Sequence, residues 1–241
     1  MQRKPAPKRG RPRAPVDFAD RLRTAIFEGR YLPNQRLTEE ELAEFLGTNR
    51  GNVRAALAKL EQQGLVVLGR NRGSRVRMVA PDEAVEIAEA RAMLERALVR
   101  EATLNATEDD IAELRTLLAE IDDGCSALDF AEYVRSSHRL HEAIARMADN
   151  AVIERLLSTL RSLGVTFNFR SVLIPGRMHE SAHEHHDLVA AIAARDPDAA
   201  EESMRKHLDE STAALRKVIA MRQASPIANY GSFLLYKGGK T

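Results

Sequence analysis

The chain has 241 residues, which is long for one compact domain and comfortable for two. Its apolar fraction of 44% is enough to bury a core and excludes a largely disordered chain. The single cysteine, Cys125, excludes a disulfide within the chain and fits a reducing compartment. No apolar run approaches the roughly 18 residues of a membrane span, and the charged N-terminus lacks the apolar segment of a signal peptide. We therefore expect a soluble, cytoplasmic protein without contact to a membrane.

The net charge of +1 hides an uneven distribution along the chain. The charge is +6 over residues 1–15, +3 over residues 16–80 and −8 over the remainder. A basic N-terminal part followed by an acidic C-terminal part indicates that the N-terminal part binds a polyanion and that the C-terminal part has another function.

Residues 1–15 contain four prolines and show no apolar periodicity, so we expect a flexible basic arm. The arm includes RGRP (Arg9 to Pro12), the core of an AT-hook, a segment that lies in A·T-rich minor grooves. Two alternatives stay open for so short a match. The arm could attract DNA without specificity, or it could serve only solubility.

Three segments with helical spacing and two β-rich segments come next, at residues 16–29, 38–47, 52–64, 65–69 and 74–79. Thr38, with Glu41 three residues later, predicts a capping box at the start of the second helix. The two β-rich segments, joined by the basic RNRG, predict a hairpin. Three helices with a short turn before the third, then a basic hairpin, are the parts of a winged helix-turn-helix.

The third of these helices begins with TNRGNVR, a polar and basic turn without an acidic residue. Arg50 and Arg54 are four residues apart and share a face, from which they can reach guanine in the major groove. Arg70, Arg72 and Arg75 belong to the hairpin, where a wing would follow the DNA backbone. These arginines could instead merely solvate a helical surface, but the arm, the helices and the wing together favour DNA binding.

From Pro81 the pattern is helical, with apolar stripes at 82–104, 107–123, 127–148, 150–173, 177–194 and 197–222. The predicted fold class is mainly α: an N-terminal winged helix-turn-helix followed by an all-α antiparallel helical bundle. We expect four parts: a flexible arm (1–15), a winged helix-turn-helix DNA-binding domain (16–80), an all-helical domain (81–222) and a tail (223–241).

Four of the seven histidines fall within HESAHEHHDL (179–188). At about 100° per residue, His185 lies on the apolar face, whereas the other three, at 179, 183 and 186, lie on a different face. His141 and His207 also lie against apolar stripes. Three inward histidines on three helices could share one metal ion, since each buried imidazole needs a partner. A polar cavity without metal remains the alternative.

The segment EGRYLPNQRLTEEELAEFLGTNRGNVRAALAKLEQQGLV, followed by NRGSRV, resembles the DNA-binding domain of the GntR family of bacterial transcription regulators. The chain departs from the family pattern at Asn34, Asn49 and Asn52, so the resemblance does not imply an operator preference. The resemblance implies contacts to double-stranded DNA by Thr38, Asn49, Arg50, Asn52, Arg54, Arg70, Arg72 and Gly73.

The segments EAVEIAEARAMLERALVREA, HRLHEAIARMADN and EHHDLVAAIAARDPDAAEESMRKHL resemble the FCD ligand-binding domain of the FadR subfamily. The resemblance implies a divalent metal held by His141, His185 and His207, with zinc favoured over nickel or manganese. Ser137 stands where the family has an aspartate ligand, so water or the effector would fill that position.

The same resemblance implies that the effector is a small organic acid whose carboxylate binds the metal. The pocket arginine of the family corresponds to Arg91, and Arg170 in TFNFRSV is a looser candidate. A salt bridge between Arg91 and Glu95, four residues on, is the alternative role for that arginine.

Taken together, the sequence predicts a ligand-responsive transcription regulator that binds a pseudo-palindromic operator as a homodimer and is not an enzyme. A metal-dependent helical-bundle enzyme is one alternative. Di-iron bundles usually need two Glu-x-x-His pairs, and only Glu180 with His183 fits that pattern, with its histidine on the outer face. An architectural DNA-binding protein, suggested by the basic arm, is the other.

Overall fold

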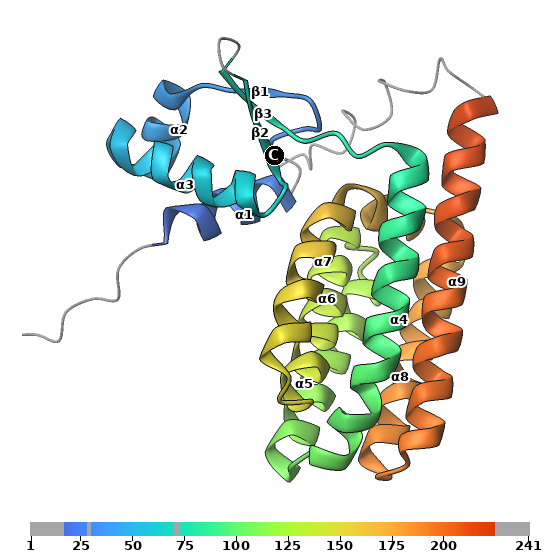
Figure 1. Cartoon of the computed structure of the whole chain (residues 1–241). Helices are drawn as coiled ribbons and strands as arrows, with labels where there is room; N and C mark the ends of the chain where they lie inside the picture. Colours follow the sequence, from blue (N-terminus) through green and yellow to red (C-terminus); the bar gives the residue numbers. More distant parts are fainter. Residues whose placement is uncertain (1–16, 28–29, 70–72, 225–241) are drawn as a thin grey trace, which may run out of the picture.

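The computed structural model of the protein describes residues 17–27, 30–69 and 73–224, without the side chains of residues 27, 164–170, 222 and 224. Its elements form two groups (Figure 1). The first group contains α1 (Phe18–Phe27), β1 (Arg36–Leu37), α2 (Glu39–Leu46), α3 (Arg50–Gln62), β2 (Val66–Gly69) and β3 (Gly73–Val76). The second contains α4 (Pro81–Asn105), α5 (Glu108–Ser126), α6 (Phe130–Met147), α7 (Ala151–Ser171), α8 (Arg177–Ala193) and α9 (Pro197–Ala224). The predicted fold class, a winged helix-turn-helix followed by a helical bundle, is confirmed.

The helix-turn-helix is bounded by local signals in the sequence. Thr38 accepts a hydrogen bond from the amide of Glu41 and starts α2. Gly47 ends α2 with φ of 65°, in the left-handed region that favours glycine. Leu42 and Leu46 are buried, as are Val53, Ala56, Leu57 and Leu60 of α3, so the two helices bury their apolar faces together in one core.

The wing contains one strand more than the predicted hairpin. β2 and β3 pair antiparallel, and β1 adds to the other edge of β3, so the strand order is β1-β3-β2. Asn34 turns the chain into β1 with φ of 64°, a conformation that asparagine tolerates better than most residues. A two-residue strand is too short to show a period of two in the sequence. Leu37, which is buried, is the only apolar residue in β1.

The bundle follows the predicted stripes closely, with one difference in α5. The predicted apolar stripe ends at residue 123, just before Gly124, but α5 continues to Ser126. A Cβ atom at Gly124 would lie 2.9 Å from the backbone nitrogen of Tyr133 in α6. This glycine therefore allows two helices to approach closely and does not end a helix.

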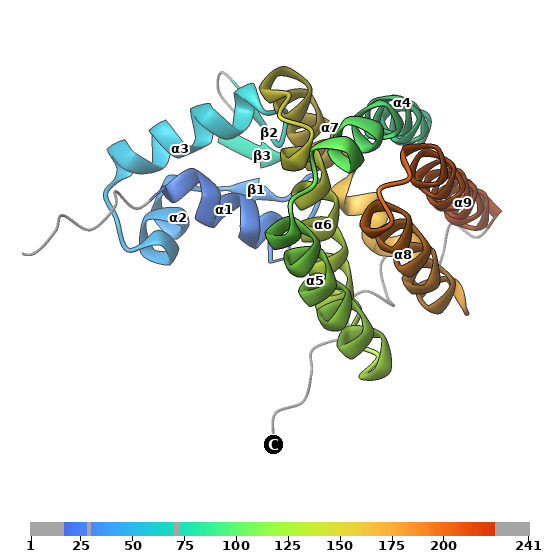
Figure 2. The same ribbon diagram turned by 90° about the horizontal axis from the view of Figure 1, so that it is seen from below.

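Separate apolar cores stabilise the two groups of elements, and a third apolar cluster lies where they meet. This cluster contains Val79, Ala84, Ile87 and Leu215, with Leu160 and Leu163 of α7 packed against it. Figure 2 shows the end of α3 and strand β2 next to α7. None of the described helices combines the length and the apolar composition that a bilayer crossing needs.

Candidate functional site

Three buried histidines from three helices of the bundle meet at one point. We call His141 of α6, His185 of α8 and His207 of α9 the histidine cluster. The Nε2 atom of His141 lies 3.2 Å from Nε2 of His207 and 3.3 Å from Nε2 of His185. Each residue offers a ligand atom, and these atoms all lie within 4.8 Å of one another. The structure thus brings together the three residues that the sequence singled out.

The division of HESAHEHHDL between two faces is also confirmed. His185 is completely buried, whereas His179, His183 and His186 are exposed. The solvent-facing His186 bonds to Asp122 of α5 at 3.0 Å. The stretch is therefore one inward histidine with a polar outer edge, and it is not a four-histidine metal cluster.

Two buried glutamates orient two of the three rings. Glu95 accepts a hydrogen bond from Nδ1 of His141 at 2.7 Å, and Glu184 accepts one from Nδ1 of His207 at 2.8 Å. A proton held on Nδ1 by a carboxylate leaves the lone pair of a neutral ring on Nε2. For these two rings, the lone pairs then point toward the centre of the cluster.

Burial and the neighbouring charges shift the pKa values of His141, His185 and Glu95. Burial disfavours the charged form of His141 and, against the pull of Glu95, lowers its pKa to about 4. Burial also lowers the pKa of His185 well below its usual range. For Glu95, burial opposes ionisation, but Arg161 and Arg91 outweigh it and hold the pKa well below the usual value. Histidine binds metal ions in its neutral form, and these pKa shifts favour neutral imidazoles beside an ionised carboxylate.

His185 lacks the outer partner that the other two rings have. Its Nδ1 is buried without a hydrogen-bond partner among the described residues. Its Nε2 lies 3.3 Å from the hydroxyl oxygen of Ser137. Ser137 therefore borders the point where the Nε2 atoms converge, at the position expected for a fourth donor.

Three arginines hold the two glutamates in place. Arg91 donates to Oε1 of Glu95 from Nε and Nη2, at 3.2 and 3.1 Å, so the predicted alternative salt bridge is present. Arg161 of α7 also bonds to Glu95, at 3.3 Å, and to the carbonyl oxygen of His141, at 3.1 Å. Arg177 forms a bidentate pair with Glu184 at 2.7 and 2.8 Å.

A cavity of about 100 Å³ opens beside the cluster, and we call it the histidine cavity. That volume is several times what a single water molecule needs. Arg91, His141, His207 and Ser137 line it, together with hydroxyl-bearing residues that include Ser181 and Ser211, while no carboxylate lies among its described lining residues. Arg170, the looser candidate, lies in the part of α7 whose side chains are outside the described set.

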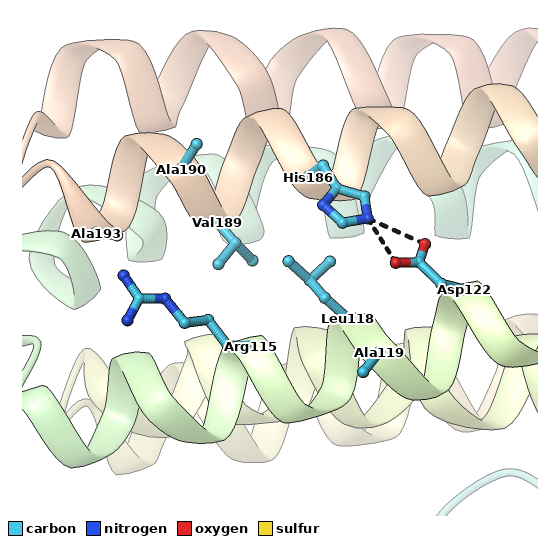
Figure 3. A pocket seen from close by; sticks show the side chains of 8 residues that line it. All are labelled: Arg115, Leu118, Ala119, Asp122, His186, Val189, Ala190 and Ala193. Carbon is cyan, nitrogen blue, oxygen red and sulfur yellow. Dashed lines mark hydrogen bonds and ion pairs between the residues drawn. The ribbon is translucent and has the colours of Figure 1, made fainter.

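A second, larger hollow lies on the surface between α5 and α8 (Figure 3). Leu118 and Val189 line it, and the pair of His186 with Asp122 lies at one side while Arg115 reaches in from the other. It contains none of the residues of the histidine cluster. The convergent, buried polar groups favour the smaller cavity as a ligand site.

The winged domain presents its candidate DNA contacts at the start of α3. Asn49 caps α3 by accepting a hydrogen bond from the amide of Asn52 at 3.0 Å. Arg50 and Arg54 are exposed, and they pair with Glu40 at 3.7 Å and with Glu39 at 2.8 Å. Both arginines therefore extend from the first turns of α3 into solvent, where each is paired with an acid of α2.

The remaining candidates are distributed between α2 and the wing. Thr38 is used as the cap of α2, and its hydroxyl also lies 2.8 Å from Oε2 of Glu41. Gly73 begins β3 with φ of 71°, in the left-handed region. Arg70 and Arg72 lie outside the described residues.

Three charged residues of the bundle site, Glu184, Arg161 and Arg177, were not predicted as part of it, and Glu95 was predicted only as the alternative ion-pair partner of Arg91. Glu95 and Glu184 are acids on apolar helix faces, a signal that a charge is buried and must be paired. Apart from Arg91, the partners of these acids could not be identified from the sequence, because they come from other helices or from two turns away. Their arrangement orients the rings of His141 and His207 and leaves three histidine nitrogens close together at one buried point.

Comparison with known proteins assigns both halves of the chain. Residues 17–76 match the model of the bacterial regulatory proteins of the gntR family, and residues 86–210 match the FCD domain. The transcriptional repressor NanR of Salmonella arizonae is 31% identical over 210 residues, which cover 77% of this chain and 76% of NanR. The Nta operon transcriptional regulator of Aminobacter aminovorans is 28% identical over 194 residues, covering 78% and 90% of the two chains.

Among solved structures, Escherichia coli McbR/YncC has a similar fold, with a TM-score of 0.75 at 23% identity over 83% of this chain and 95% of McbR. The structure of a transcriptional regulator GntR from Rhodococcus sp. RHA1 has a TM-score of 0.69 at 24% identity, and the match again covers 83% of this chain and 95% of that chain. The relatives are regulators and not enzymes, which removes the enzyme alternative. The chain therefore belongs to the GntR family of bacterial regulatory proteins and is a transcriptional regulator with an FCD domain.

Proposed function

We propose that this regulator senses a small organic acid through a divalent metal ion, zinc in preference to nickel or manganese, held by the histidine cluster. The observation that carries the proposal is the convergence of three imidazole Nε2 atoms at one buried point. Zinc binds histidine nitrogens at about 2.0–2.1 Å, so two ligands of a tetrahedral ion lie about 3.3 Å apart. The separations of 3.2 and 3.3 Å match this value.

The orientation of the rings supports the same proposal. Without a cation, the lone pairs of His141 and His207 would face each other across 3.2 Å, an unfavourable arrangement for two neutral rings. Glu95 and Glu184 are the kind of outer partner that metal-bound histidines have in most proteins. A metal bound here would act as a Lewis acid for an oxygen ligand, and Ser137 leaves room for that ligand.

The residues that line the histidine cavity indicate the chemical class of the effector. Arg91 borders the cavity, and the described lining has no acidic side chain, so an anion is the favoured occupant. The hydroxyl groups of Ser137, Ser181 and Ser211 would donate hydrogen bonds to a carboxylate or to hydroxyl groups of the ligand. We therefore assign Arg91 and Ser137 to effector binding, with Arg170 as a further candidate.

For DNA, we propose that α3 enters the major groove with Arg50, Asn52 and Arg54 toward the bases. Thr38 and Asn49 would contact phosphates near the helix N-termini, and Arg70, Arg72 and Gly73 would bring the wing to the backbone. The exposure of the α3 arginines supports this assignment. We further propose a homodimer on a pseudo-palindromic operator, since paired half-sites need two recognition helices, and a cytoplasmic location with the chromosome.

We also propose that the two domains divide near residue 80, as residues 16–80 and 81–222. The separate apolar cores and the start of α4 at Pro81 support this boundary. The arm (1–15) and the tail (223–241) would flank them.

The experiment is a zinc competition measurement with a chromophoric chelator on the full-length chain and two variants. His185→Ala removes a ligand of the cluster and should lower zinc affinity at least about 100-fold, because only two imidazoles remain. His183→Ala, on the exposed face of the same helix, is the matched control and should bind like the wild type. Equal zinc affinity in all three proteins, or none in the wild type, would reject the metal site. A thermal-shift screen of organic acids with and without zinc then identifies the effector.

A further inference from the structure

Helix α7 lies between the histidine cluster and the end of the recognition helix α3. On its inner side, Arg161 is 3% exposed and bonds to Glu95 and to the carbonyl oxygen of His141. Two residues later, about 200° around the helix, Leu163 faces the winged domain. One turn of α7 thus contacts both the histidine cluster and the end of α3.

The contact on the outer side is close. A Cβ atom at Gly64 would lie 2.8 Å from Cδ2 of Leu163, so only glycine permits this approach without displacement of the leucine. Gly64 has φ of 72° and closes α3, with its amide bonded to the carbonyl of Glu61 at 2.8 Å. Leu163 therefore packs against the turn that ends the recognition helix.

Residues from three segments surround this contact. Leu160 and Leu163 pack on the apolar cluster that includes Val79, in the segment between the wing and α4. Arg77 follows the wing, lies 3.6 Å from the same Cβ position at Gly64 and pairs with Glu83 of α4. The end of α3, the end of the wing and the start of α4 therefore all meet at Leu163 or next to it.

We propose that Arg161 and Leu163 are positioning residues that couple the histidine cluster to the recognition helix through α7. A ligand that changes the position of His141 or Glu95 also displaces Arg161, because Arg161 bonds to both. Since α7 is a continuous helix, the displacement reaches Leu163 and alters how α3 is supported. This inference rests on the proposed function insofar as the cluster is the ligand site, but the mechanical link itself does not require a metal.

The test uses hydrogen exchange of the amides at residues 60–65 in the full-length chain, with two independent perturbations of the cluster. One is addition of zinc alone, and the other is Glu95→Gln, which weakens the hold on Arg161 with no ligand present. Either should change exchange at the end of α3 by at least about fivefold, the lower end of typical coupling between sites. In Leu163→Ala, both changes should disappear, and in the conservative Leu163→Met they should return.

Leu156→Ala is the matched control, because Leu156 lies on the same helix and is 52% exposed. This variant should keep the full response. A Leu163→Ala variant that responds like the wild type, or a wild type whose α3 ignores both perturbations, overturns the inference. If zinc does not bind but Glu95→Gln still acts through Leu163, the link holds and the metal proposal fails.

Discussion

Replacement of Ser137 by aspartate should tighten metal binding. The hydroxyl oxygen of Ser137 lies 3.3 Å from Nε2 of His185, where the donor atoms of the cluster converge. The side chain of aspartate is one atom longer and would place a carboxylate oxygen near the 2.0–2.2 Å that zinc prefers. The cluster would then contain three nitrogen donors and one anionic oxygen.

The magnitude follows from two opposing effects. The attraction between a divalent ion and a carboxylate at bonding distance exceeds the roughly 4 kcal/mol of two unit charges 4 Å apart at an effective dielectric constant near 20. Desolvation of the new carboxylate in a buried site offsets much of this gain. A net gain of about 1.4–2.8 kcal/mol remains, which corresponds to a 10- to 100-fold lower zinc dissociation constant.

The assay is zinc competition against a chromophoric chelator, with Ser137→Ala as the matched control. Alanine removes the hydroxyl but adds no ligand, so its zinc affinity should stay within about threefold of the wild type, since a neutral hydroxyl is a poor zinc ligand. The reasoning would be refuted if the Ser137→Asp and Ser137→Ala variants bound zinc equally. That result would mean that the fourth position does not face the ion.

Three other changes test separate parts of the account. Arg54→Ala should weaken binding to an operator selected from random duplexes by about 10- to 100-fold in fluorescence anisotropy, because a bidentate base contact is lost. The control variant Arg115→Ala, on the bundle surface, should bind like the wild type. Equal affinities of the two variants would contradict the assignment of α3. Metal-free protein should lose at least about 3 kcal/mol of unfolding free energy between pH 6.5 and 4. The pKa of His141 is lowered to about 4 and that of His185 well below its usual range, so in this window the unfolded chain binds protons at these residues that the folded chain does not. Urea denaturation that shows constant stability across this range would disprove it. Gly124→Ala should lower the unfolding free energy by about 1–3 kcal/mol, since its Cβ would lie 2.9 Å from the backbone of Tyr133; an unchanged melting temperature would argue against the close contact of α5 and α6.

The sequence predicted the helices well because their ends carry local signals. Thr107 and Asp110 form a capping box at the start of α5, and Asp129 caps α6, which spans Phe130–Met147 where the pattern predicted 127–148. Helical periodicity also identified the inward histidine of α8. These features depend on residues that are close in the chain.

The parts that escaped prediction depend on tertiary contacts. Strand β1 exists because Leu37 packs beside β3, and its two residues carry no periodic signal. The bonds of Glu95 and Glu184 to the ring nitrogens join residues 46 and 23 positions apart. The role of Arg161 depends on how α7 lies against α4 and α6, which a helical pattern alone does not determine.

The most direct test of the metal proposal is X-ray absorption spectroscopy of the full-length chain loaded with one equivalent of zinc. The account predicts imidazole scattering from three histidines, with zinc–nitrogen distances of about 2.0–2.1 Å and the remaining positions filled by oxygen. Loss of one imidazole contribution in His185→Ala, but not in His183→Ala, should accompany it. A spectrum without histidine scattering, or one that both variants leave unchanged, would contradict the claim that this regulator holds a metal ion in its histidine cluster.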